Sequence, residues 1–322
     1  MLSRVADALF WMGRYLERAD HLARAVDVTF HLDLDLHGVL ANPVELEWNA
    51  LLSLLRQPPP PVSAGDPLSA GEAPVVAVQR WLLLDASNAG SVMACLNRAR
   101  NSARSIRGSI SPPMWRELNK LHWRLSDPAL QGRVPESPHD FCQEVQLGVL
   151  LFHGVCEATM THDESWHFIQ LGRHLERADT ILRVLDSKFS LLERGGAIDL
   201  PIRALQWGAV LKNCAAYEAY QRLYISRVEP ERVIEFLLVN PDFPYSVRFC
   251  LARIMHSLTE ISGRLPGRSD DEAVRTVGRL LSDLMYLDGR TLDGEGLHAF
   301  LGDALARCAR IGHHLHDQYA LQ

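Results

Sequence analysis

The chain has 322 residues, 47% of them hydrophobic, and a formal net charge of −6. A chain of this length and composition can bury a sizeable core, which excludes a mainly disordered protein. The negative charge argues against a general nucleic-acid binder, because such proteins need a broad positive surface. Only three of the 33 basic residues are lysines. The excess of arginine indicates fixed ion pairs or an anion site, because its planar group pairs bidentately with carboxylate or phosphate; GC-rich codon usage is an equally good explanation.

Apolar residues recur every three or four positions from Val5 to Val26, which predicts a long helix with one packed face. Similar patterns continue to His316 without an alternating strand pattern, so we expect an all-α protein of about twelve helices. Proline and glycine mark the breaks. The longest break is the proline-rich segment 57–74.

An internal repeat is the most informative feature of the sequence. Residues 13–27 read GRYLERADHLARAVD and residues 172–186 read GRHLERADTILRVLD, an offset of 159. Beyond the proline-rich segment the offset becomes 155. We therefore predict a tandem duplication of an approximately six-helix unit, with residues 1–160 as the first copy and residues 161–322 as the second. The two copies are expected to pack as one globular unit about a pseudo-twofold axis.

The repeated segment keeps charged residues on the helix face opposite its apolar seam. Spacings of three and four residues allow pairing within one helix, but exposed pairs contribute only about 0.3–0.5 kcal/mol each. If a second layer covers this face, losing one partner costs about 3–5 kcal/mol. We therefore favour a structural role in buried ion pairs over an anion site or catalytic carboxylates. The retained residues are Arg14, Glu17, Arg18 and Asp20, and Arg173, Glu176, Arg177 and Asp179.

Charge is segregated in the first copy. Residues 86–116 contain no acidic side chain, and residues 25–55 contain no Lys or Arg, so mutual neutralisation of these segments is the simplest interpretation. Arg100, Arg104 and Arg107 follow at i, i+4 and i+7, which predicts three guanidinium groups on one helical face. Their counterparts in the second copy are not arginines. We hypothesise that this stripe is an interaction surface that binds an anionic ligand, an acidic peptide or a phosphate.

Other motifs are weak or absent. No nucleotide-binding loop and no zinc-type spacing is present, and the histidines near Asp317 do not match one, so we expect neither a cofactor nor a metal. The six scattered cysteines are expected to be buried thiols. Trp115, Trp123, Trp166 and Trp207 are expected in the core. Because the first residues lack an apolar leader and no run is long enough to span a bilayer, we expect a cytoplasmic protein without a membrane partner.

The doubled GR-x-LERAD segment, with residues 98–119, resembles the bacterial alpha-E family, named for an all-helical domain with an ER motif. The resemblance covers nearly the whole chain, although Asn101 stands where the family commonly has glutamate. The family has no established activity. Its members are typically encoded beside, or fused to, circularly permuted ATP-grasp ligases and transglutaminase-like proteases, which implies a shared peptide-forming or peptide-modifying system. Residues that match the family's second block are Arg104, Arg107, Ser111, Trp115 and Asn119.

We therefore expect a non-catalytic accessory protein that binds an ATP-grasp amide ligase, a transglutaminase-like protease or their peptide product. One alternative is an enzyme of the same system that uses Glu17, Glu176 or nearby histidines in a cleft between the copies. Another is an oligomeric helical scaffold. Carboxylates locked into arginine pairs favour the binder or the scaffold, whereas their convergence with His or Asp in an open cleft favours the enzyme.

Overall fold

The computed structural model describes residues 1–36, 43–60, 74–194, 200–225, 227–263, 271–287 and 294–319. Over these ranges the chain forms fourteen α-helices, one short 3-10 helix and no strand, which confirms the all-α prediction. Two short helices, α6 (Pro128–Gly132) and α10 (Tyr217–Tyr224), account for the excess over the expected twelve. Most of the proline-rich segment lies outside the described residues.

The remaining helices follow one another in a similar order in residues 1–160, called here the first half, and residues 161–322, the second half. The first half contains α1 (Ser3–Leu36), α2 (Pro43–Leu55), α3 (Pro74–Leu83), α4 (Val92–Ser105), η1 (Arg107–Ser109), α5 (Pro112–Leu125) and α7 (His139–Thr159). The second half contains α8 (Glu164–Arg194), α9 (Leu200–Asn213), α11 (Pro230–Val239), α12 (Val247–Ser262), α13 (Glu272–Met285) and α14 (Gly294–Tyr319).

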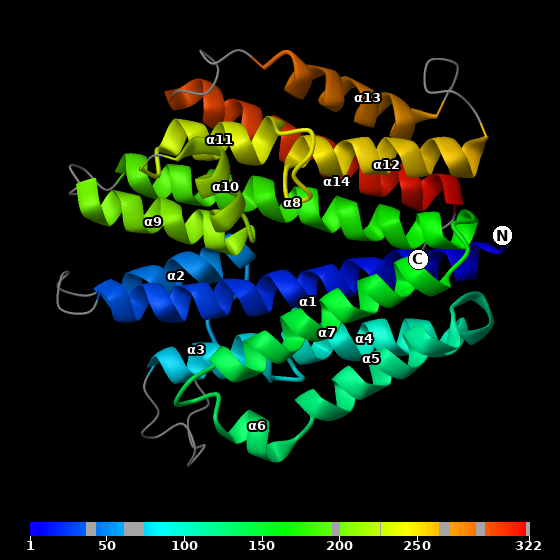
Figure 1. Ribbon diagram of the computed structural model, residues 1–322, viewed down its shortest axis with the longest axis horizontal. Coiled ribbons are helices and arrows are strands. Elements are labelled where there is room, and N and C mark those ends of the chain that lie inside the picture. Colours follow the sequence, from blue (N-terminus) through cyan, green and yellow to red (C-terminus); the bar gives the residue numbers. More distant parts are fainter. Residues whose placement is uncertain are drawn as a thin grey trace.

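The two longest helices, α1 and α8, lie side by side at the centre and run in the same direction (Figure 1). Most of the other helices of the first half are on one side of this pair in Figure 1, and those of the second half are on the other. At one end the amino terminus of Met1 lies 3.1 Å from the carboxylate of Glu164. Each half therefore places its repeated GR-x-LERAD segment against that of the other half.

Two glycines allow α1 and α8 to approach closely. A Cβ atom at Gly13 would collide with the carbonyl oxygen of Ile169, and one at Gly172 would collide with the carbonyl oxygen of Phe10. The two contacts are reciprocal, because Gly13 and Gly172 occupy the same position in the repeated segment. Only glycine lacks the Cβ atom, so backbone meets backbone at this crossing.

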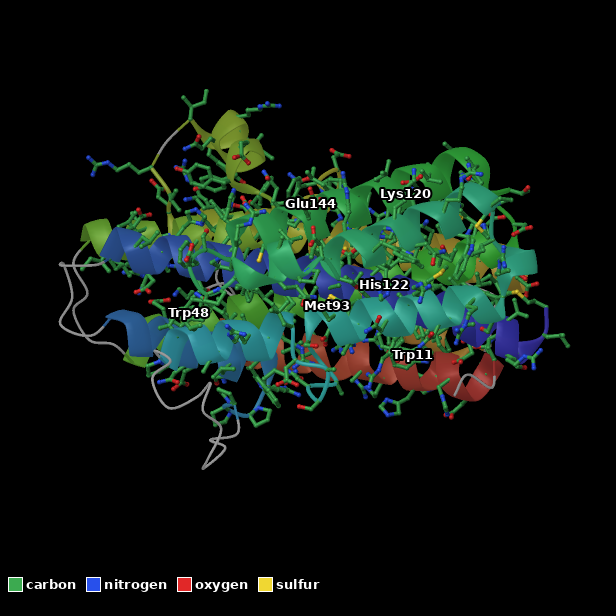
Figure 2. All side chains as sticks on the ribbon, turned by 90° about the horizontal axis from the view of Figure 1, so that it is seen from below. Trp11, Trp48, Met93, Lys120, His122 and Glu144 are labelled. Atoms are coloured by element: carbon green, nitrogen blue, oxygen red, sulfur yellow. The ribbon has the colours of Figure 1, made fainter. Side chains whose placement is uncertain are left out.

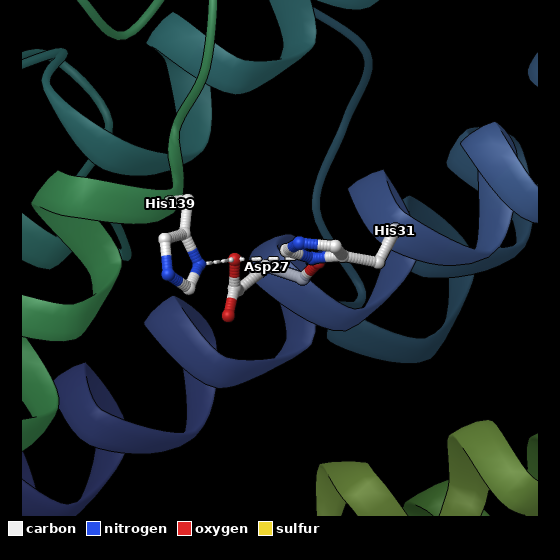
Figure 3. Close-up of side chains that lie close together, drawn as sticks. All are labelled: Asp27, His31 and His139. Atoms are coloured by element: carbon white, nitrogen blue, oxygen red, sulfur yellow. Dashed lines mark hydrogen bonds and ion pairs between the residues drawn. The ribbon is translucent and has the colours of Figure 1, made fainter.

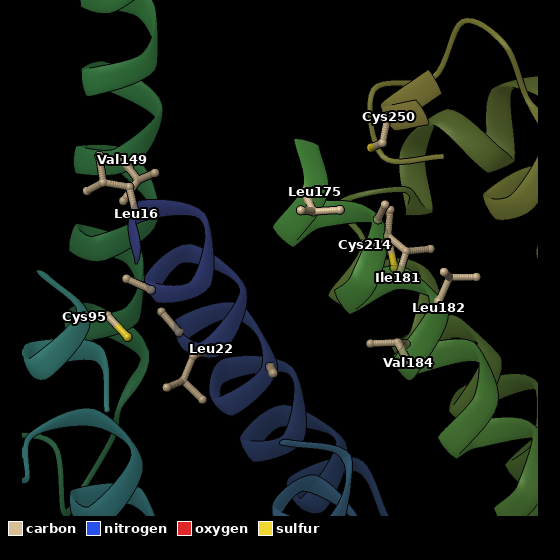
Figure 4. Packing of buried hydrophobic residues seen from close by; sticks show 14 of the residues in the cluster. Leu16, Leu22, Cys95, Val149, Leu175, Ile181, Leu182, Val184, Cys214 and Cys250 are labelled. Atoms are coloured by element: carbon tan, nitrogen blue, oxygen red, sulfur yellow. The ribbon is translucent and has the colours of Figure 1, made fainter. Parts of the chain in front are cut away.

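The same packing surrounds each central helix. Helices α4 and α7 pack on α1, and helices α12 and α14 pack on α8, while α5 and α13 form the outer layer. Serine hydroxyls start the equivalent helices, since Ser91 accepts from the amide of Ala94 and Ser246 from that of Phe249. The apolar side chains packed around α1 and those packed around α8 belong to one continuous cluster, and Figure 4 shows some of them. All six cysteines are buried with free thiols, as expected.

The tryptophan prediction is only partly right. Trp207 and Trp166 are buried, and Trp115 is half-buried, but Trp123 is 71% exposed. Helix α5 buries Leu118, Leu121 and Leu125, and position 123 falls on the opposite face. None of the helices in the described residues combines the length and apolar character needed to cross a bilayer.

The glycine crossing gives a direct test of the central packing. Gly172→Ala should lower the free energy of unfolding by about 1–3 kcal/mol or more, because neither backbone can retreat without separating the halves. Gly154→Ala on α7 is the matched control, since a Cβ atom there meets nothing within 4 Å and alanine favours a helix. Urea unfolding followed by circular dichroism measures both. Equal stability of the two variants would contradict the close approach.

Candidate functional site

Glu17 of α1 is held by arginines of α8. Its carboxylate lies 2.5 and 3.0 Å from the Nε and Nη2 atoms of Arg177, and 3.6 Å from the Nε of Arg173. The side chain of Glu17 is 1% exposed and that of Arg177 is 2% exposed. Two histidines, His21 and His153, bring Nε2 atoms to 3.2 and 3.7 Å from the same carboxylate. These residues are called the Glu17 centre.

Glu176 of α8 is held in the corresponding way by arginines of α1. Its carboxylate accepts hydrogen bonds from the Nε and Nη2 atoms of Arg18 at 2.6 and 2.9 Å, and from the Nε of Arg14 at 2.7 Å. Glu176 is buried, whereas the side chain of Arg18 is 34% exposed. These three residues are called the Glu176 centre.

The two centres exchange partners between the halves. Arg18 and Arg177 occupy the same position of the repeated segment, as do Arg14 and Arg173, so each half supplies the arginines for the glutamate of the other. The pair between Arg14 and Glu17 that their i,i+3 spacing allows does not form, because Arg14 donates to Glu176. Glu17 is held instead by Arg177 of the other half, which donates two parallel hydrogen bonds to its carboxylate.

The pairs within one helix lie one turn further along. Asp20 accepts from Arg24 at 2.9 Å, and Asp179 accepts from Arg183 at 2.6 Å. Tyr245 adds a hydroxyl to Asp20 at 3.3 Å, and its ring lies 3.9 Å from the guanidinium carbon of Arg177. Tyr245, from the loop before α12, thus contacts both Asp20 of the pair within α1 and Arg177 of the Glu17 centre.

Electrostatics keeps both glutamates ionised. Burial would raise the pKa of Glu17, but Arg177, His21 and Arg173 hold it well below its usual value. Burial would also raise the pKa of Glu176, but Arg14 and Arg18 lower it to about 2. Burial and the nearby Arg173 lower the pKa of His153, so this imidazole is neutral. A carboxylate of this kind cannot act as a general acid near neutral pH, and it is a weak base.

The centres differ in what lies beside them. Tyr245 and His21 contact the Glu17 centre, but at the corresponding positions beside the Glu176 centre the chain has Gly90 and Thr180. A cavity of about 250 Å³ occupies this space and is lined by Gly90, Thr180 and Glu176. The smaller side chains therefore leave the Glu176 carboxylate at the wall of a cavity.

A second cavity of about 470 Å³ lies against Arg14 and Arg18 and is lined on its far side by α14, including Gly312 and His313. A Cβ atom at Gly312 of α14 would lie 4.0 Å from the Nη1 of Arg14, so glycine stands beside this centre where His153 of α7 contacts Glu17. Near the other centre, a cavity of about 220 Å³ is lined by Arg173 and Arg177, and Glu17 is not among its lining residues. The Glu17 centre is closed and the Glu176 centre is open.

The arginine stripe is differently arranged from its prediction. Helix α4 ends at Ser105, and Arg107 lies in the 3-10 helix η1, so one α-helical face does not carry all three guanidinium groups. The Ser105 hydroxyl bonds back to the carbonyl of Ser102 at 2.7 Å, and Pro112 and Pro113 start a new helix. The chain therefore leaves helix α4 before it reaches Arg107.

Two of these arginines nevertheless converge on one aromatic ring. The guanidinium carbons of Arg100 and Arg107 lie 5.9 and 5.1 Å from the ring centre of Trp115. The Nε of Arg100 donates to the Oδ1 of Asn119 at 2.8 Å, and the amide of Asn119 donates to the carbonyl of Trp115 at 2.7 Å. Arg104 is exposed on the last turn of α4. We call Arg100, Arg104, Arg107 and Trp115 the arginine–tryptophan surface.

This surface keeps its positive charge. Across the residues that the structure describes, no carboxylate pairs with Arg100, Arg104 or Arg107. Burial and the proximity of Arg100 lower the pKa of His122, whose Nδ1 is buried without a hydrogen-bond partner. Figure 2 views this side of the molecule and labels His122 of α5 and Met93 of α4.

Mutual neutralisation within the first half is therefore wrong. Asp27 contacts His31 and His139, and Glu47 pairs with Lys188 of the second half at 3.2 Å. The acidic segment lies on α1 and α2, where histidines contact Asp27, Lys188 pairs with Glu47, and the buried Oδ1 of Asp33 has no hydrogen-bond partner. Proximity in sequence said nothing of which helices pack together.

Sequence reasoning missed His153 of the Glu17 centre and Tyr245, which packs beside that centre. Tyr245 lies in a loop whose counterpart is glycine, so the repeat gives no signal for it. His153 did leave a signal, since it interrupts the apolar run from Leu147 to Phe152 on α7. A histidine at a buried position of a helix calls for a polar partner, and here the partner is Glu17.

Comparison with known proteins identifies the family of this chain. A family profile described as a predicted alpha-helical domain with a conserved ER motif, Alpha-E, matches residues 1–320. The chain belongs to the Alpha-E family. The two ER pairs of this Alpha-E chain are Glu17-Arg18 and Glu176-Arg177, which supply both glutamates and both bidentate arginines described above.

The relatives of this Alpha-E chain include uncharacterized proteins of Mycobacterium bovis and Mycobacterium tuberculosis, each 25% identical over 315 residues. The alignment covers 94% of this chain and 35% of each relative. The chain thus spans about a third of the length of these relatives. No solved structure matches the chain.

The closed centre should dominate stability. Glu17→Ala leaves Arg177 buried without its partner, which should cost about 3–5 kcal/mol of unfolding free energy. Glu144→Ala on α7 removes the exposed pair with Arg124 and should cost about 0–1 kcal/mol. Urea denaturation of both variants measures the difference. Similar losses would show that the Glu17 centre is not the buried pair described.

Acid should weaken the Glu176 centre. The pKa of Glu176 is about 2 in the folded chain against an ordinary value of 4.5, so its contribution of about 3 kcal/mol is present above pH 4.5 and is lost as the pH falls towards 2. The stability gap between the wild type and Glu176→Gln should therefore narrow from pH 7 to pH 3. Urea titrations across this range test the prediction, which a constant gap would refute.

Proposed function

We propose that this Alpha-E chain is a non-catalytic binding component that recognises an acidic partner or peptide through the arginine–tryptophan surface. The observation that carries the proposal is the convergence of Arg100 and Arg107 on Trp115 without a carboxylate partner in the described residues. By contrast, Arg14 and Arg18 pair with Glu176, and Arg173 and Arg177 pair with Glu17.

The chemistry of this surface suits carboxylates. Arg100 donates its Nε–H to Asn119, so the Nη1 and Nη2 atoms of Arg100 are available for a paired interaction with an incoming carboxylate. Trp115 supplies a flat apolar area beside the charges, which suits a peptide chain more than a small inorganic anion. An acidic peptide segment is therefore the ligand class we propose.

The partner proposed is the system that the family resemblance implies, namely a circularly permuted ATP-grasp amide ligase, a transglutaminase-like protease, or their peptide product. The length of the mycobacterial relatives supports an accessory role, since the matched region is about a third of each protein and the rest of each relative lies outside it. We place the binder ahead of the enzyme because both glutamates are locked in arginine pairs.

We further propose that residues 1–160 and 161–322 are two copies of one helical unit, packed about a pseudo-twofold axis. The exchange of arginines between the halves and the matched glycine contacts support this, because an isologous interface repeats each contact in reverse. In this arrangement the arginine–tryptophan surface is a specialisation of the first copy, since Met255 and Thr259 take the places of Arg100 and Arg104.

A binding experiment with charge-matched variants tests the proposed function. Arg100→Ala/Arg104→Ala/Arg107→Ala should weaken binding to a fluorescent glutamate-rich peptide, and co-purification with a co-expressed circularly permuted ATP-grasp ligase, by about tenfold or more. Affinity for the wild type should fall as salt rises. Fluorescence anisotropy gives the dissociation constants, and an ATP-dependent ligation assay with and without the chain reads out its effect on the ligase.

The matched control removes the same charge from the second half. Its substitutions are Arg275→Ala, Arg279→Ala and Arg310→Ala, all at exposed positions of α13 and α14. The control should bind as the wild type does. Unchanged affinity in the first variant, with a normal circular dichroism spectrum, would sink the proposal, and so would equal weakening in both variants.

A further inference from the structure

A histidine-rich cluster lies on the first half, away from both glutamate centres. It contains Asp27 and His31 of α1 and His139, the first residue of α7. One donor atom from each residue lies within 4.8 Å of the others (Figure 3). Among the described residues, no other group of three His, Cys, Asp or Glu side chains brings its donor atoms this close together.

The distances suit a metal ion. The Oδ1 atom of Asp27 lies 2.9 Å from the Nδ1 of His139 and 3.4 Å from the Nδ1 of His31. Ligands about 2.1 Å from a tetrahedral zinc ion are about 3.4 Å apart, so an ion fits between these atoms after small side-chain movements. The Nδ1 of His31 now contacts the main-chain oxygen of Asp27 at 2.8 Å, and metal binding at Nδ1 would replace this hydrogen bond and leave the imidazole proton on Nε2.

The second half shows which part of the cluster needs no metal. His298 contacts Asp186 through Nδ1 and Oδ1 at 2.8 Å, and these residues follow His139 and Asp27 by 159. An Asp–His contact therefore ties the long helix to the last long helix in both halves. The position of His31 is taken by Ser190 in the second half. The third ligand is present in the first half alone, and the shared contact does not explain it.

The exposure and chemistry of the cluster point to a particular class of ion. His31 and His139 are 48% and 43% exposed, so an ion held here keeps a coordination position open to solvent. Two imidazoles with one carboxylate suit zinc, cobalt, nickel, copper or ferrous iron, whereas magnesium and calcium prefer oxygen ligands.

We propose that Asp27, His31 and His139 form a binding site for a divalent transition-metal ion such as Zn²⁺, with one position open to water or an anionic ligand. The ion would bridge α1 and α7 across the first half. Sequence spacing predicts no metal site here because 112 residues separate Asp27 from His139. The site is independent of the peptide-binding function proposed above, since it shares no residue with the arginine–tryptophan surface.

The test uses the full chain without a histidine tag, stripped of metal with a chelator. Isothermal titration with Zn²⁺ should show one ion per chain, and Co²⁺ should give the visible absorption of a low-coordinate nitrogen and oxygen site. His31→Ser, which introduces the residue of the second half, should weaken Zn²⁺ binding at least about tenfold. Excess Zn²⁺ should raise the Tm of the wild type more than that of His31→Ser.

Two controls locate the ion. His298→Ala removes the matching histidine of the second half, and His313→Ala/His316→Ala removes histidines near the end of α14. Both variants should bind Zn²⁺ as the wild type does. The proposal is overturned if the wild type binds no stoichiometric Zn²⁺, if His31→Ser binds with unchanged affinity, if either control loses binding, or if Mg²⁺ binds equally well.

Discussion

The exchange of arginines between α1 and α8 is the constraint on which the rest of the fold depends. Burying a carboxylate is costly unless a cation and hydrogen bonds accompany it, and each glutamate takes its arginine partners from the other half. Gly13 and Gly172 bring the helices close enough for the side chains to reach across. The outer helices cover α1 and α8. The register of these two helices is fixed, because a shift of one along the other would leave buried charges unpaired.

The same exchange explains how the halves can be alike and yet differ. The charged pairs must be kept in both, since each serves the other, but the residues around them are free to change. Tyr245, His21 and His153 close one centre, whereas Gly90, Thr180 and Gly312 stand at the matching places around the other. The cavities beside Glu176 therefore arise from smaller neighbours and not from a different pairing of charge.

Function is better placed outside the charged centre than within it. Glu176 borders a cavity, but its pKa of about 2 and its two arginine partners make it a fixed anion, which anchors helices and does not transfer protons. In the first half, arginines gather around Trp115 and His31 stands beside Asp27 and His139, whereas the corresponding positions of the second half carry other residues. The two binding sites proposed for this chain both rest on these differences.

The sequence by itself determined the helical class, the repeated segment and the identity of the glutamates and arginines in the two charged centres. It did so because helix periodicity and retained charges are local properties that a single chain displays. Only the tertiary structure decided that Glu17 pairs with Arg177, that Arg107 leaves the helix of Arg100 yet meets it at Trp115, and that His139 reaches Asp27. These contacts join residues on different helices, and their geometry depends on how the helices pack, which no spacing along the chain records.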